Sequence, residues 1–424
     1  MGGENQASQI LDSLLFPKIF RSFRMAVQPS KLIIALGMIA AISLAGWLMD
    51  LHSTVVTTPG TNKRETELNI YLTSPASPER VKSYIERYSD SKQRRGVFST
   101  LWGLGRETFH GTLAEMFAFN VSGVLRNVTE YIGAVQWAVR FHTIYFLIFA
   151  GVTLCVVSVG GGAICRIAAL QFARDEKPGI MEALRFSLKR FVSFASAPLV
   201  PAGMVIAAGA CIILLGLTAN IPFGLGELIA GILMPLALVG GAIIAVVLIG
   251  TVAGFNLMFP AVAYNGSDGL DAVSRSFNYV YARPWRMAFY TMASAVYGAI
   301  CYIFVRFFAF LLLWSTYRGL RLGAGLDSAL GLPDKITAIW PEPSFSRLLA
   351  YSTAAGSRSE SAAAFLVYLF ALIIVGLVVS FIISFYFSAN TVIYSLLRNK
   401  VDNTPLEEIY TEPQISKPQT GQGA

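Results

Sequence analysis

The sequence predicts an all-α fold, a polytopic membrane helix bundle that crosses a bilayer about six times. Of its 424 residues, 54% are apolar and only 14% are charged, whereas roughly a quarter are charged in soluble domains. A helix of about 20 apolar residues spans the ~30 Å hydrocarbon core of a bilayer, and a chain in lipid must bond its backbone internally. Six stretches are long enough: residues 32–51, 143–169, 192–218, 237–263, 287–315 and 363–395.

A short pattern that occurs twice indicates an internal repeat within these stretches. Residues 182–187 read Glu-Ala-Leu-Arg-Phe-Ser, and residues 271–276 read Asp-Ala-Val-Ser-Arg-Ser. Each copy follows one apolar stretch and leads into the next, so we expect a short cytoplasmic interfacial helix in each of two elbows, 171–191 and 265–286. A carboxylate at the start of each helix suits the positive end of the helix dipole. The repeated residues, to which we assign a structural role, are Glu182, Ala183, Ser187, Asp271, Ala272 and Ser276.

The apolar residues of both elbows recur at helical spacing, which predicts the face that each elbow helix packs. The expected contact residues are Ile180, Leu184, Leu188 and Phe191 in the first elbow, and Leu270, Val273, Phe277 and Val280 in the second.

Basic residues predict the orientation of the chain. The net charge is +8, but most basic residues flank apolar stretches, which favours contact with anionic headgroups over nucleic-acid binding. Basic clusters precede the first span, occupy both elbows and follow the last span, while the loop at 219–226 has none. With six spans these clusters fall on one side. We therefore expect a bacterial inner (cytoplasmic) membrane protein with both termini in the cytoplasm.

The segments outside the spans have distinct compositions. In residues 1–31, an apolar stripe lies opposite a basic one, which predicts an amphipathic helix that Pro17 kinks or divides in two. We favour a membrane anchor over a lipid sensor. Residues 52–142, expected to be helical, and the loop 317–361 fall on the extracytoplasmic side. The polar residues 401–424 are expected to form a disordered tail.

One region leaves two interpretations open. Residues 226–264 are too long for a single helix within the bilayer. Either the helix breaks at Pro235, or residues 228–234 form a short interfacial or re-entrant piece before a normal span. A complete extra hairpin would move the basic residues of the second elbow outside, so we retain six spans.

The arrangement from 143 to about 400, five spans with repeated elbows and the ending Tyr394-Ser395-Leu396-Leu397-Arg398, resembles a group of uncharacterised bacterial membrane proteins. These are similar to the membrane domain attached to some glycerophosphodiester phosphodiesterases. The resemblance implies a fold and a membrane location. It does not imply the activity, because the sequence has no phosphodiesterase domain and no paired acidic and histidine motif.

No residue pattern points to catalysis or to a cofactor. The three histidines, His52, His110 and His142, lack metal-ligand spacing, and neither a phosphate-binding loop nor a nucleophile elbow occurs. The four cysteines lie within or beside spans without a paired motif, as small core residues do. We therefore expect no catalytic residue, no metal and no cofactor.

Arg306 is a charged residue inside the fifth apolar stretch. A charge at this depth costs at least about 2.5 kcal/mol on insertion scales, so the side chain needs a partner, water or access to the interface. The functional hypothesis is an anion or lipid-headgroup site in the outer half of the bundle. The alternative, which we favour, is that Arg306 extends to the outer phosphates.

Together these features favour a non-enzymatic membrane protein, a scaffold or accessory subunit. Its expected partners are membrane lipids and either another protein or a second copy of the chain, without nucleic acid. The alternative is a transporter or channel for a small or lipid-like, possibly anionic substrate, because transporters are often built from repeats. A membrane-embedded lipid enzyme is the weakest of the three hypotheses, since the carboxylates and histidines form no cluster.

Overall fold

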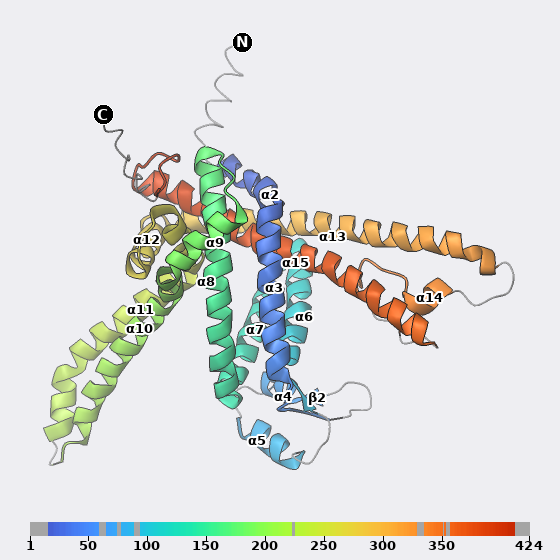
Figure 1. The fold of residues 1–424 in the computed structure, drawn as a ribbon. Coiled ribbons are helices and arrows are strands. Elements are labelled where there is room, and N and C mark those ends of the chain that lie inside the picture. Colours follow the sequence, from blue (N-terminus) through green and yellow to red (C-terminus); the bar gives the residue numbers. More distant parts are fainter. Residues whose placement is uncertain are drawn as a thin grey trace, which may run out of the picture. The chain divides into compact units, whose positions relative to one another are not determined.

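The computed structural model confirms the predicted all-α membrane bundle (Figure 1). It describes residues 16–58, 65–73, 78–88, 94–222, 225–328, 335–350, 352 and 357–411.

Six of the described helices are long and apolar enough to cross a membrane, as the sequence predicts. They are α3 (Pro29–Asp50), α8 (Thr143–Arg174), α10 (Phe191–Leu217), α11 (Leu225–Asn265), α13 (Pro284–Ser328) and α15 (Arg358–Val401). All six extend beyond the apolar stretches that predict them or match them closely, because polar residues at a helix end continue the backbone ladder outside the lipid.

α11 runs unbroken for 41 residues, with Pro235 and Pro260 inside it. At ~1.5 Å per residue this is more than ~60 Å of helix, about twice the hydrocarbon thickness. Of the two interpretations left open for 226–264, the structure has neither a break at Pro235 nor a separate re-entrant piece. A helix of this length has to tilt or to extend beyond the bilayer.

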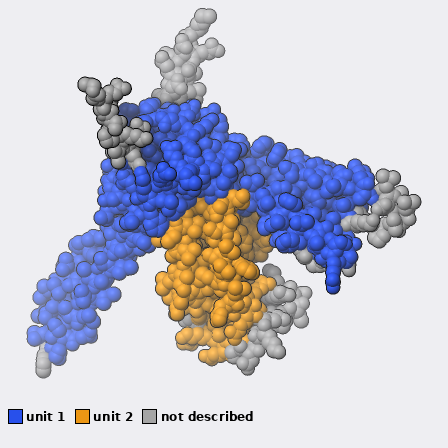
Figure 2. All heavy atoms as spheres, viewed as in Figure 1, with its two compact units in different colours: residues 1–35, 158–424 blue, residues 36–157 orange. Residues whose placement is uncertain are grey.

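The chain divides into two compact units (Figure 2). Unit 1 comprises residues 1–35 and 158–424, and unit 2 comprises residues 36–157. α3 and α8 each start in one unit and end in the other.

Within unit 1, α10 and α11 form a hairpin joined by η2 (Thr218–Asn220) (Figure 1). The elbow helices are α9 (Ile180–Lys189) and α12 (Gly269–Ala282), and α12 packs against both helices of the hairpin. α13 packs along α15, and α14 (Lys335–Ile339) lies on this pair. Leu313, Tyr317, Trp340, Leu348 and Ala371 form the core between these three helices.

The predicted amphipathic N-terminal helix is described only from Phe16, and its first 15 residues lie outside the described residues. The described part forms η1 (Phe16–Phe20) and α2 (Arg21–Ala26), which pack on α13 and α15. Phe23 meets Phe304 and Phe381 edge-on, and Ser384 donates a hydrogen bond to the Ala26 carbonyl. The apolar stripe of this segment therefore contacts the helices of unit 1.

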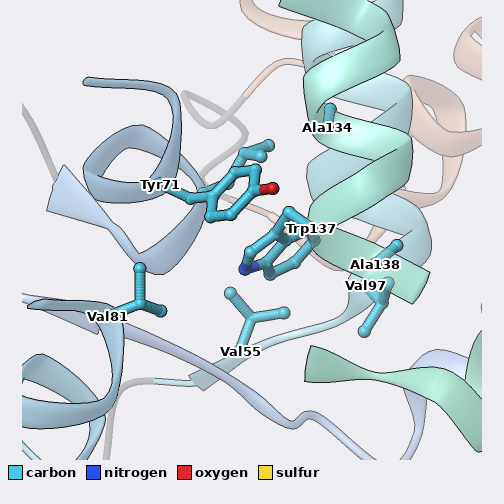
Figure 3. Packing of buried hydrophobic residues seen from close by; sticks show 8 residues of the cluster. Val55, Tyr71, Val81, Val97, Ala134, Trp137 and Ala138 are labelled. Atoms are coloured by element: carbon cyan, nitrogen blue, oxygen red, sulfur yellow. The ribbon is translucent and has the colours of Figure 1, made fainter. Parts of the chain in front are cut away.

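Unit 2 contains a small sheet that the sequence did not predict. The order of its strands is β2 (Glu65–Thr66), β1 (Val55–Thr58), β3 (Arg94–Arg95), all antiparallel. Four further helices complete the unit: α4 (Glu67–Thr73), α5 (Pro78–Arg87), α6 (Val97–Phe117) and α7 (Val121–Phe141). The core gathers around Trp137 (Figure 3), with Val55, Leu68, Tyr71, Val81, Val97, Ala134 and Ala138.

Both elbows contain the predicted short helix, but the first packs a different face from the one expected. In α9 the buried residues are Ala183, Phe186 and Ser187, whereas Leu188 of the predicted stripe is 59% exposed. Next to a bilayer, apolar side chains can face lipid, and close helix contacts go to small residues. In α12 the buried face includes Ala272 and Ser276 and, as predicted, Val273 and Val280, although Leu270 is exposed.

Each elbow serine lies against a glycine of the span before it. A Cβ on Gly162 would lie 2.4 Å from Ser187 Oγ, and a Cβ on Gly254 would lie 3.4 Å from the Ser276 carbonyl oxygen. Glycines that let helices approach are typical of membrane bundles. In both elbows, therefore, the serine of the six-residue pattern lies near a glycine of the preceding span.

Two predicted boundaries are wrong. The outer loop predicted at 317–361 starts later and ends earlier, because α13 continues to Ser328 and α15 begins at Arg358, where Ser357 and Glu360 form a capping box. The tail predicted to be disordered from 401 is ordered through Thr411, because its backbone and side chains bond to the spans. Residues 412–424 lie outside the described residues.

Candidate functional site: an arginine hub closed by the C-terminal segment

Three arginines converge at one end of unit 1. Arg166 comes from α8, Arg190 follows α9, and Arg398 lies in the last turn of α15. All three bond to residues 402–411, which we call the C-terminal segment. We call the three arginines together with this segment the arginine hub.

Arg166 is the most buried of the three, with 7% of its surface exposed. Its guanidinium donates to the carbonyl oxygen of Ala263 at 2.9 Å and to that of Tyr410 at 2.8 Å. The charge also lies 4.4 Å from the centre of the Phe186 ring, within the range of a cation–π interaction. α8, α9, α11 and the C-terminal segment thus meet on one side chain.

Arg190 holds the start of the second elbow. It donates to the carbonyl oxygen of Gly266 and, at 3.1 Å, to the Tyr410 hydroxyl. Gly266 has a φ of 62°, and a Cβ there would lie 2.6 Å from the Tyr410 ring. Only glycine fits this position, because the backbone is left-handed and the tyrosine ring occupies the space of a side chain.

Arg398 fixes the middle of the C-terminal segment. It donates to the Glu408 carbonyl oxygen at 2.6 Å and to its carboxylate at 3.1 Å, and it lies 5.4 Å from the Tyr264 ring centre. The Tyr264 hydroxyl donates to the Leu406 carbonyl at 2.8 Å, and its own carbonyl accepts the Tyr410 N–H at 2.9 Å. The segment is therefore bonded at 406, 408 and 410.

The acceptors in the hub are mostly uncharged. Four main-chain carbonyls, those of Ala263, Gly266, Glu408 and Tyr410, accept from the three arginines, and the Glu408 carboxylate accepts from Arg398. Bonds from a cation to carbonyls satisfy its donors without neutralising its charge. The segment also carries Asp402, Glu407 and Glu408, so the three arginines and the three carboxylates give the hub a formal charge of zero.

Besides Arg166 and Arg398, Lys31 is a third buried cation of unit 1. Lys31 has no exposed surface, and its ammonium donates to the Met25 carbonyl at 3.0 Å, to Gln171 Oε1 at 2.9 Å and to Ser388 Oγ at 3.4 Å. None of these acceptors is charged. Within the described part of the chain, no carboxylate forms an ion pair with Lys31, so its charge is compensated by neutral oxygens alone.

The Ser388 contact belongs to a polar stripe along α15. Its members recur every three or four residues, so they share one face of the helix, and all are buried: Ser380, Ser384, Ser388, Thr391 and Ser395. Ser395 reaches the Tyr264 hydroxyl of the hub at 3.0 Å. The stripe therefore runs past Lys31 to the hub.

The repeated elbow residues are structural in different ways. The two alanines and two serines are buried, while Glu182 is exposed and Asp271 is partly exposed. Asp271 pairs with Arg275 at 2.8 Å, and this bond raises the pKa of the Arg275 guanidinium. Asp268 caps the start of α12 by accepting the Asp271 N–H at 2.8 Å.

Next to the second elbow, Tyr279 links α12 to the C-terminal segment. Its hydroxyl donates to Asp402 Oδ2 at 2.5 Å. Burial raises the pKa of the Tyr279 hydroxyl, because a low-dielectric surrounding disfavours the phenolate. The hydroxyl therefore stays protonated and keeps its donor at neutral pH.

The Arg306 guanidinium is bonded within the chain. Its guanidinium donates to the carbonyl oxygens of Phe345 at 2.9 Å and Ser346 at 3.2 Å, and to the Tyr302 hydroxyl at 2.9 Å. It also lies 5.2 Å from the Phe345 ring centre. Arg306 thus fixes the outer loop on α13, and an anion or lipid site there stays a prediction.

The histidines and cysteines do not belong to the arginine hub. His142 in unit 2 is 3.5 Å from the buried Glu67 carboxylate, and Cys155, Cys165, Cys211 and Cys301 are free thiols. Among the described residues, no group of three histidine, cysteine, aspartate or glutamate side chains could hold a metal ion.

Sequence reasoning did not identify the hub or Lys31. Arg166, Arg190, Arg398 and Lys31 were read only as charges that orient the chain. Arg166 carried a usable signal, because it lies between Cys165 and Ile167, eight residues before the end of α8. Such a position needs an internal partner.

Comparison with known proteins identifies no relative of this chain. No family model, curated protein or solved structure matches the chain. The fold and the hub define a multi-pass α-helical membrane protein, and its function has to be argued from its own residues.

Proposed function

We propose that the protein is a non-enzymatic scaffold or accessory subunit that binds partner proteins or lipids in the bacterial inner membrane. The observation that carries this proposal is the α10–α11 hairpin. Of the apolar 18-residue stretch within each of these two helices, only 6% is buried. Ile206 and Val252 are 71% and 85% exposed. Polytopic spans normally pack against several neighbours, so the hairpin offers two long faces to a partner helix or to lipid.

The arginine hub favours a structural role for the end of the α10–α11 hairpin that adjoins the elbows. Its cations are bonded to carbonyls and stacked on rings of the same chain. A catalytic centre instead needs groups that can bond a substrate and move a proton. Because the hub ties α8, α11 and α15 together, it suits a platform that holds the hairpin in place.

The location and topology are part of this proposal. The basic residues of the hub and of both elbows lie at one end of the unit 1 helices, which favours the cytoplasm for that end and for both termini. The resemblance to the membrane domain of glycerophosphodiester phosphodiesterases fits an accessory membrane module that acts with another protein. No activity follows from that resemblance.

A transporter or channel is the second candidate, because Lys31 is a buried cation beside the polar stripe of α15. Ionisable residues within spans often mark a substrate or ion path. This candidate predicts solute flux that depends on Lys31, whereas the scaffold does not.

The test is a mild-detergent purification of the full chain, with mass spectrometry of the proteins that copurify. Ile206→Trp with Val252→Trp enlarges the hairpin faces and should abolish capture of a stoichiometric partner. Phe304→Trp is the matched control, because Phe304 is a 61% exposed residue of α13, and it should retain the partner.

Absence of a stoichiometric partner, or equal capture by both variants, would contradict the scaffold proposal. Release of solute from loaded vesicles, lost in Lys31→Met, would establish the transporter instead. The Lys31→Met variant should capture the partner as the wild type does.

A further inference from the structure

A cleft in unit 2 lies beside the end of α3. Its volume is about 360 Å³, and its lining includes Trp47, Asp50, Leu51, Arg94, Arg95 and Ser99. Ligand sites in proteins have volumes of roughly 300–1,000 Å³, so the cleft can hold a group of several heavy atoms. No residue of the cleft belongs to the arginine hub.

The depth of this cleft relative to the bilayer follows from the length of α3. Its 22 residues at ~1.5 Å each cover about the thickness of the hydrocarbon core, so its last turn lies at the membrane boundary. Tryptophan and tyrosine concentrate at this level. Trp47 and Trp102 are 60% and 50% exposed there, and Tyr145 bonds Asp50 at 2.9 Å.

The cleft adjoins an apolar surface on one side. Leu44 and Leu48 of α3, which flank the lining residue Trp47 in the sequence, are exposed. In a bilayer this surface faces acyl chains, while the cleft itself opens among the headgroups. A ligand that fills the cleft and covers this surface has to be polar at one end and apolar at the other.

The single acidic residue of the lining, Asp50, is already used within the protein. Its carboxylate accepts the N–H groups of Phe98 at 3.0 Å and Ser99 at 2.8 Å, the Ser99 hydroxyl, and the Tyr145 hydroxyl. These bonds cap the first turn of α6 and offset the negative charge with the positive end of that helix.

The other charged residues of the lining are Arg94 and Arg95. They form β3, which pairs with Val55 and Val56 of β1, so their backbone is fixed by the sheet. Both side chains are exposed. Arginine suits phosphate because its planar group donates two parallel hydrogen bonds. The cleft therefore combines two exposed arginines, whose backbone the sheet fixes, with a position at headgroup level.

We propose that this cleft binds the phosphate group of a membrane phospholipid. Arg94 and Arg95 hold the phosphate, Trp47 lies beside the glycerol, and the acyl chains run along Leu44 and Leu48. The apolar surface commits the site to a lipid instead of a free phosphate ion. The assignment goes beyond the scaffold function, since a transporter could hold the same lipid.

The experiment uses the full chain, purified in mild detergent and titrated with phosphatidylglycerol, with native mass spectrometry to count bound lipid. Arg94→Gln with Arg95→Gln should weaken binding about tenfold to a hundredfold, because it removes the charge-assisted donors of the cleft. The control is Lys82→Gln with Arg87→Gln, which removes two exposed charges from α5 of the same unit and should bind as the wild type does.

Three results would overturn the proposal. Equal binding by the wild type and the Arg94/Arg95 variant would exclude the cleft, and equal loss in the α5 control would show a general charge effect. Competition by soluble glycerol phosphate at the affinity of the lipid would show an anion site without acyl-chain contacts. Thermal unfolding of both variants should match the wild type, which separates lost binding from lost fold. Partner capture is measured separately, so either proposal can fail alone.

Discussion

The two elbows start from the same sequence pattern and bury the same small residues, but their polar contacts differ. In the first, Ser187 donates across to the Ser158 carbonyl of α8 at 2.9 Å. In the second, Ser276 bonds the Ala272 carbonyl one turn back in its own helix. Both elbows therefore bury the same alanine and serine, while the surroundings decide what the serine bonds and how closely the helix approaches its span.

The glycine contacts should show the largest difference between the elbows. Gly162→Ala places a Cβ 2.4 Å from Ser187 Oγ and 2.8 Å from the Phe194 ring, so the free energy of unfolding should fall by about 1–3 kcal/mol. In Gly254→Ala the nearest atom is 3.3 Å away, and the loss should be smaller. Thermal unfolding in detergent measures both, and equal losses would contradict a tighter first elbow.

The second largest difference in stability is expected between substitutions at the residues that begin the two elbows. Gly266 and Asp175 both follow a long helix with positive φ, 62° and 57°. Gly266→Ala should destabilise by about 1–2 kcal/mol from the backbone alone, with a further loss from contact with Tyr410. Asp175→Gly should be neutral or slightly stabilising, because it removes backbone strain. If Gly266→Ala unfolds at the wild-type temperature, the Tyr410 packing described for the hub is wrong.

The elbow serines should show a smaller difference. Ser187→Ala removes a bond between two helices and should cost about 0.6–1 kcal/mol. Ser276→Ala removes a bond within one turn, which hardly stabilises a helix, so its midpoint of unfolding should stay close to the wild type. The double variant tests whether the two effects add, as expected for separate sites.

The elbow carboxylates should show the smallest difference. Asp271→Asn breaks the partly exposed pair with Arg275 and should cost about 0.3–0.5 kcal/mol. Glu182→Gln changes an exposed residue of α9 and should have less effect. Raising the salt concentration should reduce the Asp271 effect, because salt screens exposed pairs; an effect that salt leaves unchanged would argue against the pair as its source.

The sequence predicts the spans and elbows of this fold because apolar length and a repeated motif are local features. It did not predict the hub, because the contact between Arg166 and Tyr410 joins residues 244 positions apart. The polar composition of the last residues predicts disorder, and yet the burial of Ile409 and the bonds of Tyr410 order the segment. The prediction of which face the first elbow helix buries was wrong, because lipid as well as protein can cover apolar side chains.

The cleft could not be predicted either. Arg94 and Arg95 follow a charged stretch and carry no motif, and only the pairing of β3 with β1 brings them to the end of α3. In the sequence, Asp50 is simply an acidic residue at the end of a span. In the structure it is the cap of α6, 48 residues away.

The C-terminal segment gives the chain an order of assembly. The ribosome makes Arg166 and Arg190 long before Tyr410, which is 244 and 220 residues further on. Until then, water or headgroups have to satisfy these guanidinium groups. The hub therefore closes last, and a chain truncated before residue 410 lacks the bonds that Tyr410 forms with Arg166 and Arg190.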